Sequence, residues 1–290
     1  MATTMPARRS TLTTALLSAV ALSTFALPGA AQAAPVPAPR SGHLACASAQ
    51  LDVDYESGTT DSGIEDLTTT HAPAADASFI VQGGAHGSTY AVAHKVTLGD
   101  PGYFSNGAYR SESATDLHEA SRFRPGDTDR YEFSTKMPTD WEDWSEGESA
   151  NGEIIFQAKP ANSNQPSWLI MTKRNEIAFR SPVPNLQYAL VADYRPYIGQ
   201  WLDFRVDVHW AADATGYYRV WTRLPGQSTY RKVVDLSNLV TWQPANPADF
   251  GYVKWGLYRA ATSLEDGDVP TRVIYHDDVR VLDGPGATVS

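Results

Sequence analysis

The chain contains 290 residues, of which 42% are hydrophobic and 19% are charged, and its formal net charge is −10. This composition excludes a disordered tail and a coiled coil, and it predicts a globular domain with a sizeable core. No segment after the N-terminus approaches the roughly eighteen continuous apolar residues of a membrane-spanning helix, so we expect no membrane contact. The chain carries no nucleic-acid-binding motif, and we expect no nucleic-acid partner.

Residues 1–33 have the three regions of a signal peptide. Two arginines, Arg8 and Arg9, precede an apolar run, and the small residues Ala31-Gln32-Ala33 resemble a cleavage site. The arginine pair is also compatible with the twin-arginine export route. We therefore expect a secreted, extracellular protein.

Residues 34–50 form a Pro- and Ala-rich lead-in, and residues 51–290 are predicted to form one domain without internal repeats. The only cysteine, Cys46, lies in the lead-in. An intrachain disulfide and a Cys-based zinc site are therefore excluded, and the core must provide the stability. We expect a monomer.

The apolar residues of the domain recur with a period of two, which indicates strands. Phe204, Val206 and Val208 alternate with polar residues before a turn at 213–216, as in a hairpin. In chain order, further strands are expected at 78–81, 90–98, 107–113, 129–137, 153–158, 168–172, 176–181, 217–221, 252–259 and 272–282. Many short strands between Gly and Pro turns predict an all-β jelly-roll sandwich of two antiparallel sheets. The stretches 137–152 and 182–200 are expected to be loops at the rim of a cleft.

The strand 252–259 has one apolar and one polar face. Its apolar face carries Val253, Trp255 and Leu257, and its polar face carries Tyr252, Lys254, Gly256 and Tyr258. A glycine inside a strand is costly unless something approaches the backbone closely, and a flat sugar ring would do so. The alternative interpretation is an ordinary sheet with its polar face in water.

Two further strands also carry polar residues on one face. Arg110 and Glu112 share a face in the first, and Glu153, Gln157 and Lys159 share a face in the second. Together the three strands suggest a polar, concave floor.

These segments resemble the jelly-roll polysaccharide lyases, which include glucuronan lyases, alginate lyases and the heparin lyase I group. That family has an Arg-x-Glu strand, a Gln-bearing strand and a late Tyr-Phe-Lys-x-Gly-x-Tyr strand. The matching segments here, in the same order, are Arg110-Ser111-Glu112, Ile155-Phe156-Gln157 and Tyr252-Val253-Lys254-Trp255-Gly256-Leu257-Tyr258. The resemblance covers nearly all of the domain. It implies a concanavalin A-like jelly roll that cleaves an anionic, uronic-acid-containing polysaccharide by β-elimination without a required cofactor.

The resemblance also implies catalytic roles. Elimination removes the proton at C5, next to the sugar carboxylate, and expels the glycosidic oxygen from C4. Arg110 and Gln157 are suited to neutralise that carboxylate, because donors placed there stabilise the enolate-like transition state. Tyr258 is the expected base, since a nearby cation such as Lys254 would favour its phenolate.

The histidine of this mechanism is not fixed by the resemblance. Alginate lyases commonly carry Gln-x-His on the middle strand, and Lys159 stands at that His position here. We expect His118 to transfer protons instead, with His94 as the second choice. The expected substrate-binding residues are Glu112, Lys159, Tyr252, Arg259 and His94.

Acidic residues near the first and last strands, Glu56 and Asp278 among them, could hold a structural calcium ion. They could equally be solvated acids at strand ends.

The acidic net charge and the small number of basic residues favour a nonsulfated polyuronate, such as glucuronan or alginate, over heparin. Two other classes of function stay open. A noncatalytic lectin would explain the aromatic residues. A glycoside hydrolase would need two carboxylates beside the bond, and the segment 153–157 supplies only one of them.

Overall fold

The computed structural model describes residues 49–148, 151–243 and 249–284. The predicted signal peptide, and the predicted lead-in up to residue 48, lie outside the described residues. The first strand, β1 (Ala49–Val53), begins within the last two residues of the predicted lead-in. None of the helices in the described part of the chain is long and apolar enough to cross a membrane.

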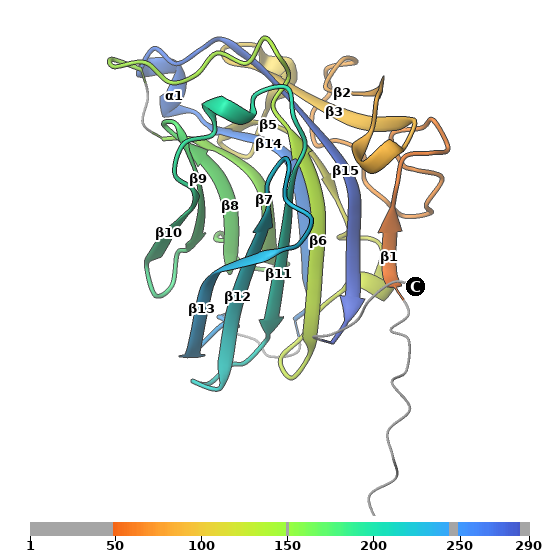
Figure 1. The fold of residues 1–290 in the computed structure, drawn as a ribbon, viewed down its shortest axis with the longest axis vertical. Helices are drawn as coiled ribbons and strands as arrows, with labels where there is room; N and C mark the ends of the chain where they lie inside the picture. The colour runs from red at the N-terminus through yellow and green to blue at the C-terminus, as the bar shows by residue number, and fades with distance from the viewer. Residues whose placement is uncertain (1–48, 149–150, 244–248, 285–290) are drawn as a thin grey trace, which may run out of the picture. The chain divides into compact units, whose positions relative to one another are not determined.

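The prediction of an all-β jelly-roll sandwich is confirmed, because the described strands form two antiparallel sheets (Figure 1). The first sheet has the order β13 (Arg231–Leu239), β12 (Gly216–Arg223), β11 (Leu202–His209), β6 (Thr128–Lys136), β15 (Thr271–Asp283), β3 (Tyr90–Thr97) and β2 (Ser78–Gln82), with β1 paired to β15. The second has the order β10 (Leu186–Val191), β9 (Glu176–Ser181), β8 (Trp168–Lys173), β7 (Glu153–Pro160), β14 (Gly251–Ala260), β5 (Ala108–Ala114) and β4 (Phe104–Ser105). The one α-helix of the described residues, α1 (Thr262–Glu265), is a single turn.

The core lies between the two sheets and is built by the alternating apolar residues. Phe133 on β6 stacks on Phe156 on β7, with 4.2 Å between the ring centroids. Trp168 and Trp255 are fully buried in the same cluster. Aromatic side chains bury large apolar areas, so this stack joins the sheets and leaves the outer face of β7, β14 and β5 free for polar residues.

Besides β1 and the two-residue β4, two longer strands differ from the expected pattern. The segment 182–200 was expected to be a loop, but it contains β10. The expected strands also did not include β13. Both lie at the edges of their sheets and carry many exposed positions, so their apolar alternation is weak.

Candidate functional site

A cavity of about 470 Å³ lies over β5, β14 and β7. Strand pairing produces it, because Tyr258 lies opposite Arg110 and Lys254 lies opposite Gln157. The residues that line the cavity are Asn106, Arg110, Ile154, Gln157, Lys159, Asn164, Pro166, Lys254 and Tyr258. Four of the five residues predicted to be catalytic therefore share one site. No carboxylate is among the described residues that line the cavity, so these residues do not supply the pair that a glycoside hydrolase needs.

Glu112 lies beneath the cavity and holds its hydrogen-bond donors in place. Its side chain is 2% exposed, and it accepts hydrogen bonds from Gln157 Nε2 at 2.5 Å and from Lys254 Nζ at 2.6 Å. Burial alone would raise the pKa of Glu112, but the Lys254 and Arg110 cations outweigh this effect and lower it. The carboxylate is therefore ionised at neutral pH. Glu112 was expected to bind substrate, and the structure gives it a positioning role.

Arg110 and Gln157 keep donors that other protein groups do not use. Arg110 Nε is buried and has no hydrogen-bond partner among the described residues. The Arg110 guanidinium also lies over the Tyr258 ring, 4.7 Å from its centroid. Gln157 Nε2 carries two hydrogens, and its bond to Glu112 uses one of them. A carboxylate in the cavity could therefore receive hydrogen bonds from both side chains, beside the Tyr258 phenol.

Lys159 and Tyr252 form a cross-strand pair at the margin of this site. Burial, and then the charges of Lys254 and Arg110, lower the pKa of Lys159. Burial also raises the pKa of Tyr252 to about 12, so its phenol is protonated at neutral pH. Tyr252 can donate a hydrogen bond but is poorly suited to act as a base.

His71, which the sequence did not point to, lies near the charged groups of the site, although it does not line the cavity. The backbone of Thr68 pairs with that of Ala114, which fixes the segment before His71 beside the end of β5. His71 Nε2 is buried without a hydrogen-bond partner among the described residues. Burial, followed by the positive charge of Lys254, lowers the pKa of His71. The imidazole is therefore neutral at neutral pH, and its buried Nε2 is not used by another described group.

The two histidines that were selected lie elsewhere. His118 contacts Ser121 Oγ through Nδ1 at 3.0 Å, within its own turn, and it does not line the cavity. His94 is fully buried, with Nδ1 3.0 Å from Ser111 Oγ, and burial lowers its pKa to about 3. A side chain in this interior position cannot touch a polysaccharide, which corrects the expected role of His94.

The glycine of β14 is required by packing against the neighbouring strand. Gly256 has φ +139°, and a Cβ there would lie 2.2 Å from the Ser111 carbonyl oxygen and 3.0 Å from His94 Cγ. The side of Gly256 on which a Cβ would lie is filled by protein atoms. Packing within the protein therefore explains this glycine, and not the expected approach of a sugar ring.

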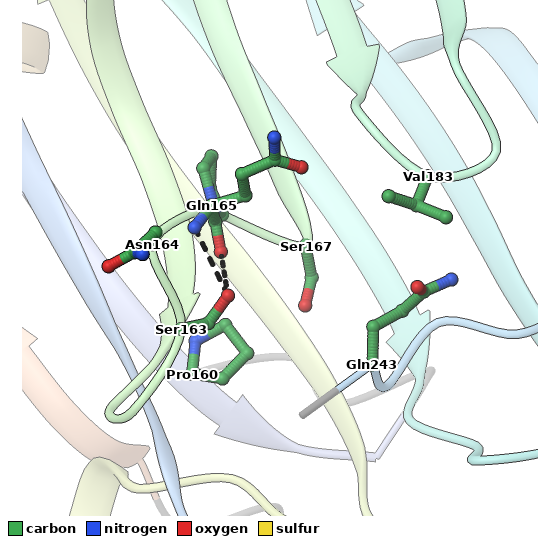
Figure 2. A pocket seen from close by; sticks show the side chains of 8 residues that line it. Pro160, Ser163, Asn164, Gln165, Ser167, Val183 and Gln243 are labelled. Atoms are coloured by element: carbon green, nitrogen blue, oxygen red, sulfur yellow. Dashed lines mark hydrogen bonds between the residues drawn. The ribbon is translucent and has the colours of Figure 1, made fainter. Parts of the chain in front are cut away.

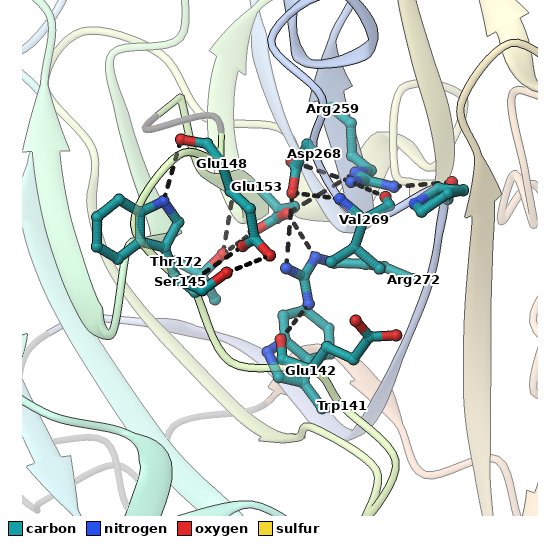
Figure 3. A network of polar contacts seen from close by, with 12 residues as sticks. Trp141, Glu142, Ser145, Glu148, Glu153, Thr172, Arg259, Asp268, Val269 and Arg272 are labelled. Carbon is teal, nitrogen blue, oxygen red and sulfur yellow. Dashed lines mark hydrogen bonds and ion pairs between the residues drawn. The ribbon is translucent and has the colours of Figure 1, made fainter.

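Arg259 was expected to bind substrate, but it lies inside the protein in a network of charges (Figure 3). Its side chain is 0% exposed and it bonds Asp268 at 3.0 Å, while Arg272 bonds Glu153 at 2.8 Å. A register shift between Ile154 and Phe156 turns Glu153 into this network and places Ile154 in the cavity. Arg259 and Glu153 therefore do not contribute to the polar floor.

The two residues expected at a calcium site are already engaged. Glu56 accepts hydrogen bonds from the backbone N–H groups of Thr89 and Tyr90, at 2.7 and 2.9 Å. Asp278 contacts Arg280 at 3.3 Å. Within the described ranges, no group of three or more His, Cys, Asp or Glu residues could hold a metal ion. The arrangement of Glu56 and Asp278 does not fit the predicted calcium site.

A second pocket, of about 280 Å³, adjoins the cavity and shares Asn164 and Pro166 with it. Figure 2 shows that its wall is uncharged; the lining residues are Pro160, Ser163, Asn164, Gln165, Pro166, Ser167, Val183 and Gln243. The Ser167 Oγ is buried and has no partner among the described residues. The site is thus longer than the cavity alone.

A jelly-roll sandwich with a cavity rich in carboxylate-binding groups is an arrangement suited to an enzyme that acts on acidic polysaccharides. A profile of the family described as "Polysaccharide lyase" matches residues 56–280, and the chain belongs to this family. It is therefore a polysaccharide lyase. The search of curated proteins gave no match.

Solved structures show the same fold. The endo-β-1,4-glucuronan lyase of the fungus Trichoderma reesei is 18% identical with a TM-score of 0.57, over 81% of this chain and 95% of that one. The PL-14 alginate lyase of Aplysia kurodai is 9% identical with a TM-score of 0.55, over 81% and 99%. The family 7 alginate lyase A1-II′, solved with substrate, is 13% identical with a TM-score of 0.50, over 80% and 97%.

Proposed function

We propose that this polysaccharide lyase cleaves a nonsulfated polyuronate, similar to glucuronan or alginate, in the cavity over β5, β14 and β7. The observation that carries the proposal is the convergence of unused donors of Arg110 and Gln157 with the phenol of Tyr258 in one cavity. A uronate carboxylate and the C5 proton beside it require this combination of groups.

In this mechanism the donors neutralise the sugar carboxylate. Arg110 Nε and the free Gln157 N–H bind the carboxylate and stabilise the negative charge that spreads onto it when the C5 proton leaves. Glu112 fixes Gln157 and Lys254 before substrate arrives, so little reorganisation is needed during the reaction. Each such donor typically contributes about 100- to 1000-fold to the rate.

Proton transfer is assigned to Tyr258 and His71. Tyr258 reacts as the phenolate, after its hydroxyl proton has passed to the neutral His71 or to water. The phenolate takes the C5 proton, the C5–H electron pair forms the C4–C5 double bond, and the C4–O bond breaks. The leaving oxygen receives a proton, either from Tyr258 or from a water molecule. His71 is neutral, unpaired and close enough to Glu112 and Lys254 to feel their charges, so it is the second proton carrier. It takes the role expected of His118.

The charge in the cavity favours a substrate with few negative groups per sugar. Three cations line it, and the Glu112 carboxylate pairs with two of them, with Lys254 at 2.6 Å and with Arg110 at 3.9 Å. The positive charge left to balance the substrate is therefore small, which suits one carboxylate better than a carboxylate with several sulfates. Such polymers are extracellular, and the signal-peptide-like residues 1–33 support the proposal that the protein is secreted.

The test is to incubate the purified protein with glucuronan, alginate, heparin and pectate and to follow the ultraviolet absorbance of C4–C5 unsaturated uronate. A rise on glucuronan or alginate, and little or none on heparin, supports the proposal. A rise on heparin alone would overturn the assignment to a nonsulfated polymer.

A further inference from the structure

The face that holds the cavity continues over β8, β9 and β10, which lie side by side beyond β7 (Figure 1). Strand pairing aligns Gln157, Leu169, Arg180 and Gln187 in one row across these strands. Register partners point to the same face of a sheet, so Arg180 faces the same side as Gln157. Only β8 lies between the strands of Gln157 and Arg180, so the backbones of these two residues are two strand spacings, or about 10 Å, apart.

The floor between Gln157 and Arg180 is apolar. Leu169, Met171 and Ala178 form a cluster separate from the main core, and Ile154 packs against it. Ile154 also lines the cavity, so this apolar floor begins where the cavity ends. An apolar strip beside a row of hydrogen-bond donors is suited to the carbon-hydrogen face of a sugar ring.

Arg180 is a cation without a partner among the residues that the structure describes. Its side chain is half-buried, and its register partners on both sides, Leu169 and Gln187, are uncharged. No hydrogen bond, ion pair or ring contact joins its guanidinium to another described side chain. By contrast, Lys173 and Glu176 on the same two strands are both bonded to Gln187. A partly desolvated guanidinium without a carboxylate is typical of a position that receives an anion from a ligand.

We propose that Arg180 binds a second carboxylate of the polymer, two sugars away from the uronate that is cleaved. This inference rests on the proposed function, since it requires a substrate with a carboxylate on successive sugars. The planar guanidinium grips that carboxylate in two places while the intervening sugar lies on the apolar floor. The enzyme therefore prefers chains long enough to reach from the cavity to β9.

The test compares Arg180→Gln with Arg231→Gln, a matched control at an exposed arginine of β13 in the other sheet. On the polyuronate that the wild-type enzyme cleaves, Arg180→Gln is expected to raise KM about tenfold and to leave kcat within about twofold. On the shortest oligouronate that is cleaved, both variants should match the wild type. Arg180→Lys should raise KM less than Arg180→Gln does, because lysine keeps the positive charge but cannot form the two parallel hydrogen bonds of a guanidinium. An unchanged KM on the polymer, or an equal loss on the shortest oligomer, would overturn the proposal.

A binding measurement separates this inference from the proposed function. In a Tyr258→Phe background, calorimetric titration with glucuronan or alginate should show about tenfold weaker binding when Arg180→Gln is added. Equal binding would overturn the role of Arg180, whether or not elimination is observed. If the wild type binds polyuronate but forms no unsaturated product, the proposed function fails while Arg180 is still tested. If no polyuronate binds, both fail.

Discussion

The buried carboxylate of Glu112 organises the site, and its replacement by glutamine is the most informative perturbation. Glu112→Gln keeps the shape of the side chain but removes the charge that balances Lys254, whose side chain is only 5% exposed. It also changes the acceptor that orients the Gln157 amide. We therefore expect a loss of both stability and activity.

The magnitude follows from the burial of the pair. Removing one partner of a buried ion pair costs roughly 3–5 kcal/mol, and the lower value applies because a glutamine oxygen can still accept from Lys254. For a domain of this size, roughly 3 kcal/mol lowers the melting temperature by about 6–12 °C. Misplacement of the Gln157 donor should reduce kcat about 100-fold.

Thermal unfolding of Glu112→Gln, Lys254→Met and the double variant measures the coupling. The double variant should be destabilised by less than the sum of the single variants, because it leaves no unpaired ammonium. Glu265→Gln, at an exposed acid of α1, serves as the control and should leave the melting temperature unchanged. Additive effects within about 0.5 kcal/mol, or an unchanged melting temperature for Glu112→Gln, would show that Glu112 and Lys254 are not coupled in this way.

Two further predictions concern titrating groups. His71→Gln should lower kcat about 100-fold. Burial and nearby cations lower the pKa of His71, so the acidic limb in a plot of wild-type kcat against pH should lie below pH 6.5. An acidic limb at pH 7 or above would contradict this. Burial raises the pKa of Asp129 to about 7, so its native carboxyl keeps a proton that the unfolded chain releases near pH 4. This contribution to stability is complete below pH 4 and is lost as the pH rises through 7. Between pH 5 and pH 8, the free energy of unfolding should therefore fall by roughly 3 kcal/mol less in Asp129→Asn than in the wild type. Denaturant unfolding at the two pH values measures this difference, and an equal fall in both proteins would contradict the prediction.

The sequence predicted the part of the site that follows strand alternation. Arg110, Gln157, Lys254 and Tyr258 lie on strands, and the period of two places each of them on the polar face. The same alternation contradicts the expected substrate-binding role of Arg259, because the pattern that buries Val253, Trp255 and Leu257 also turns residue 259 inward. The structure shows this inward position, where Arg259 is stabilised by Glu153 and Asp268.

Other parts of the site depend on contacts that are distant in the sequence. His71 lies in a segment without periodicity, and the pairing of Thr68 with Ala114 that places it is not visible locally. His94 lies on a strand of the opposite sheet, and alternation alone does not show which sheet a strand joins. The register shift after Ile154 exchanges the faces of two neighbouring residues, which no simple period predicts.

The central claim, that elimination takes place at the Tyr258 phenol, is tested most directly by measuring unsaturated product formed by Tyr258→Phe. Phenylalanine keeps the ring under Arg110 and removes only the hydroxyl. The control is Tyr188→Phe, at a tyrosine of β10 that is 38% exposed. We expect Tyr258→Phe to stay folded, to bind polyuronate and to lose at least about 100-fold in kcat, while Tyr188→Phe keeps full activity. Full activity of a folded Tyr258→Phe variant would contradict this claim.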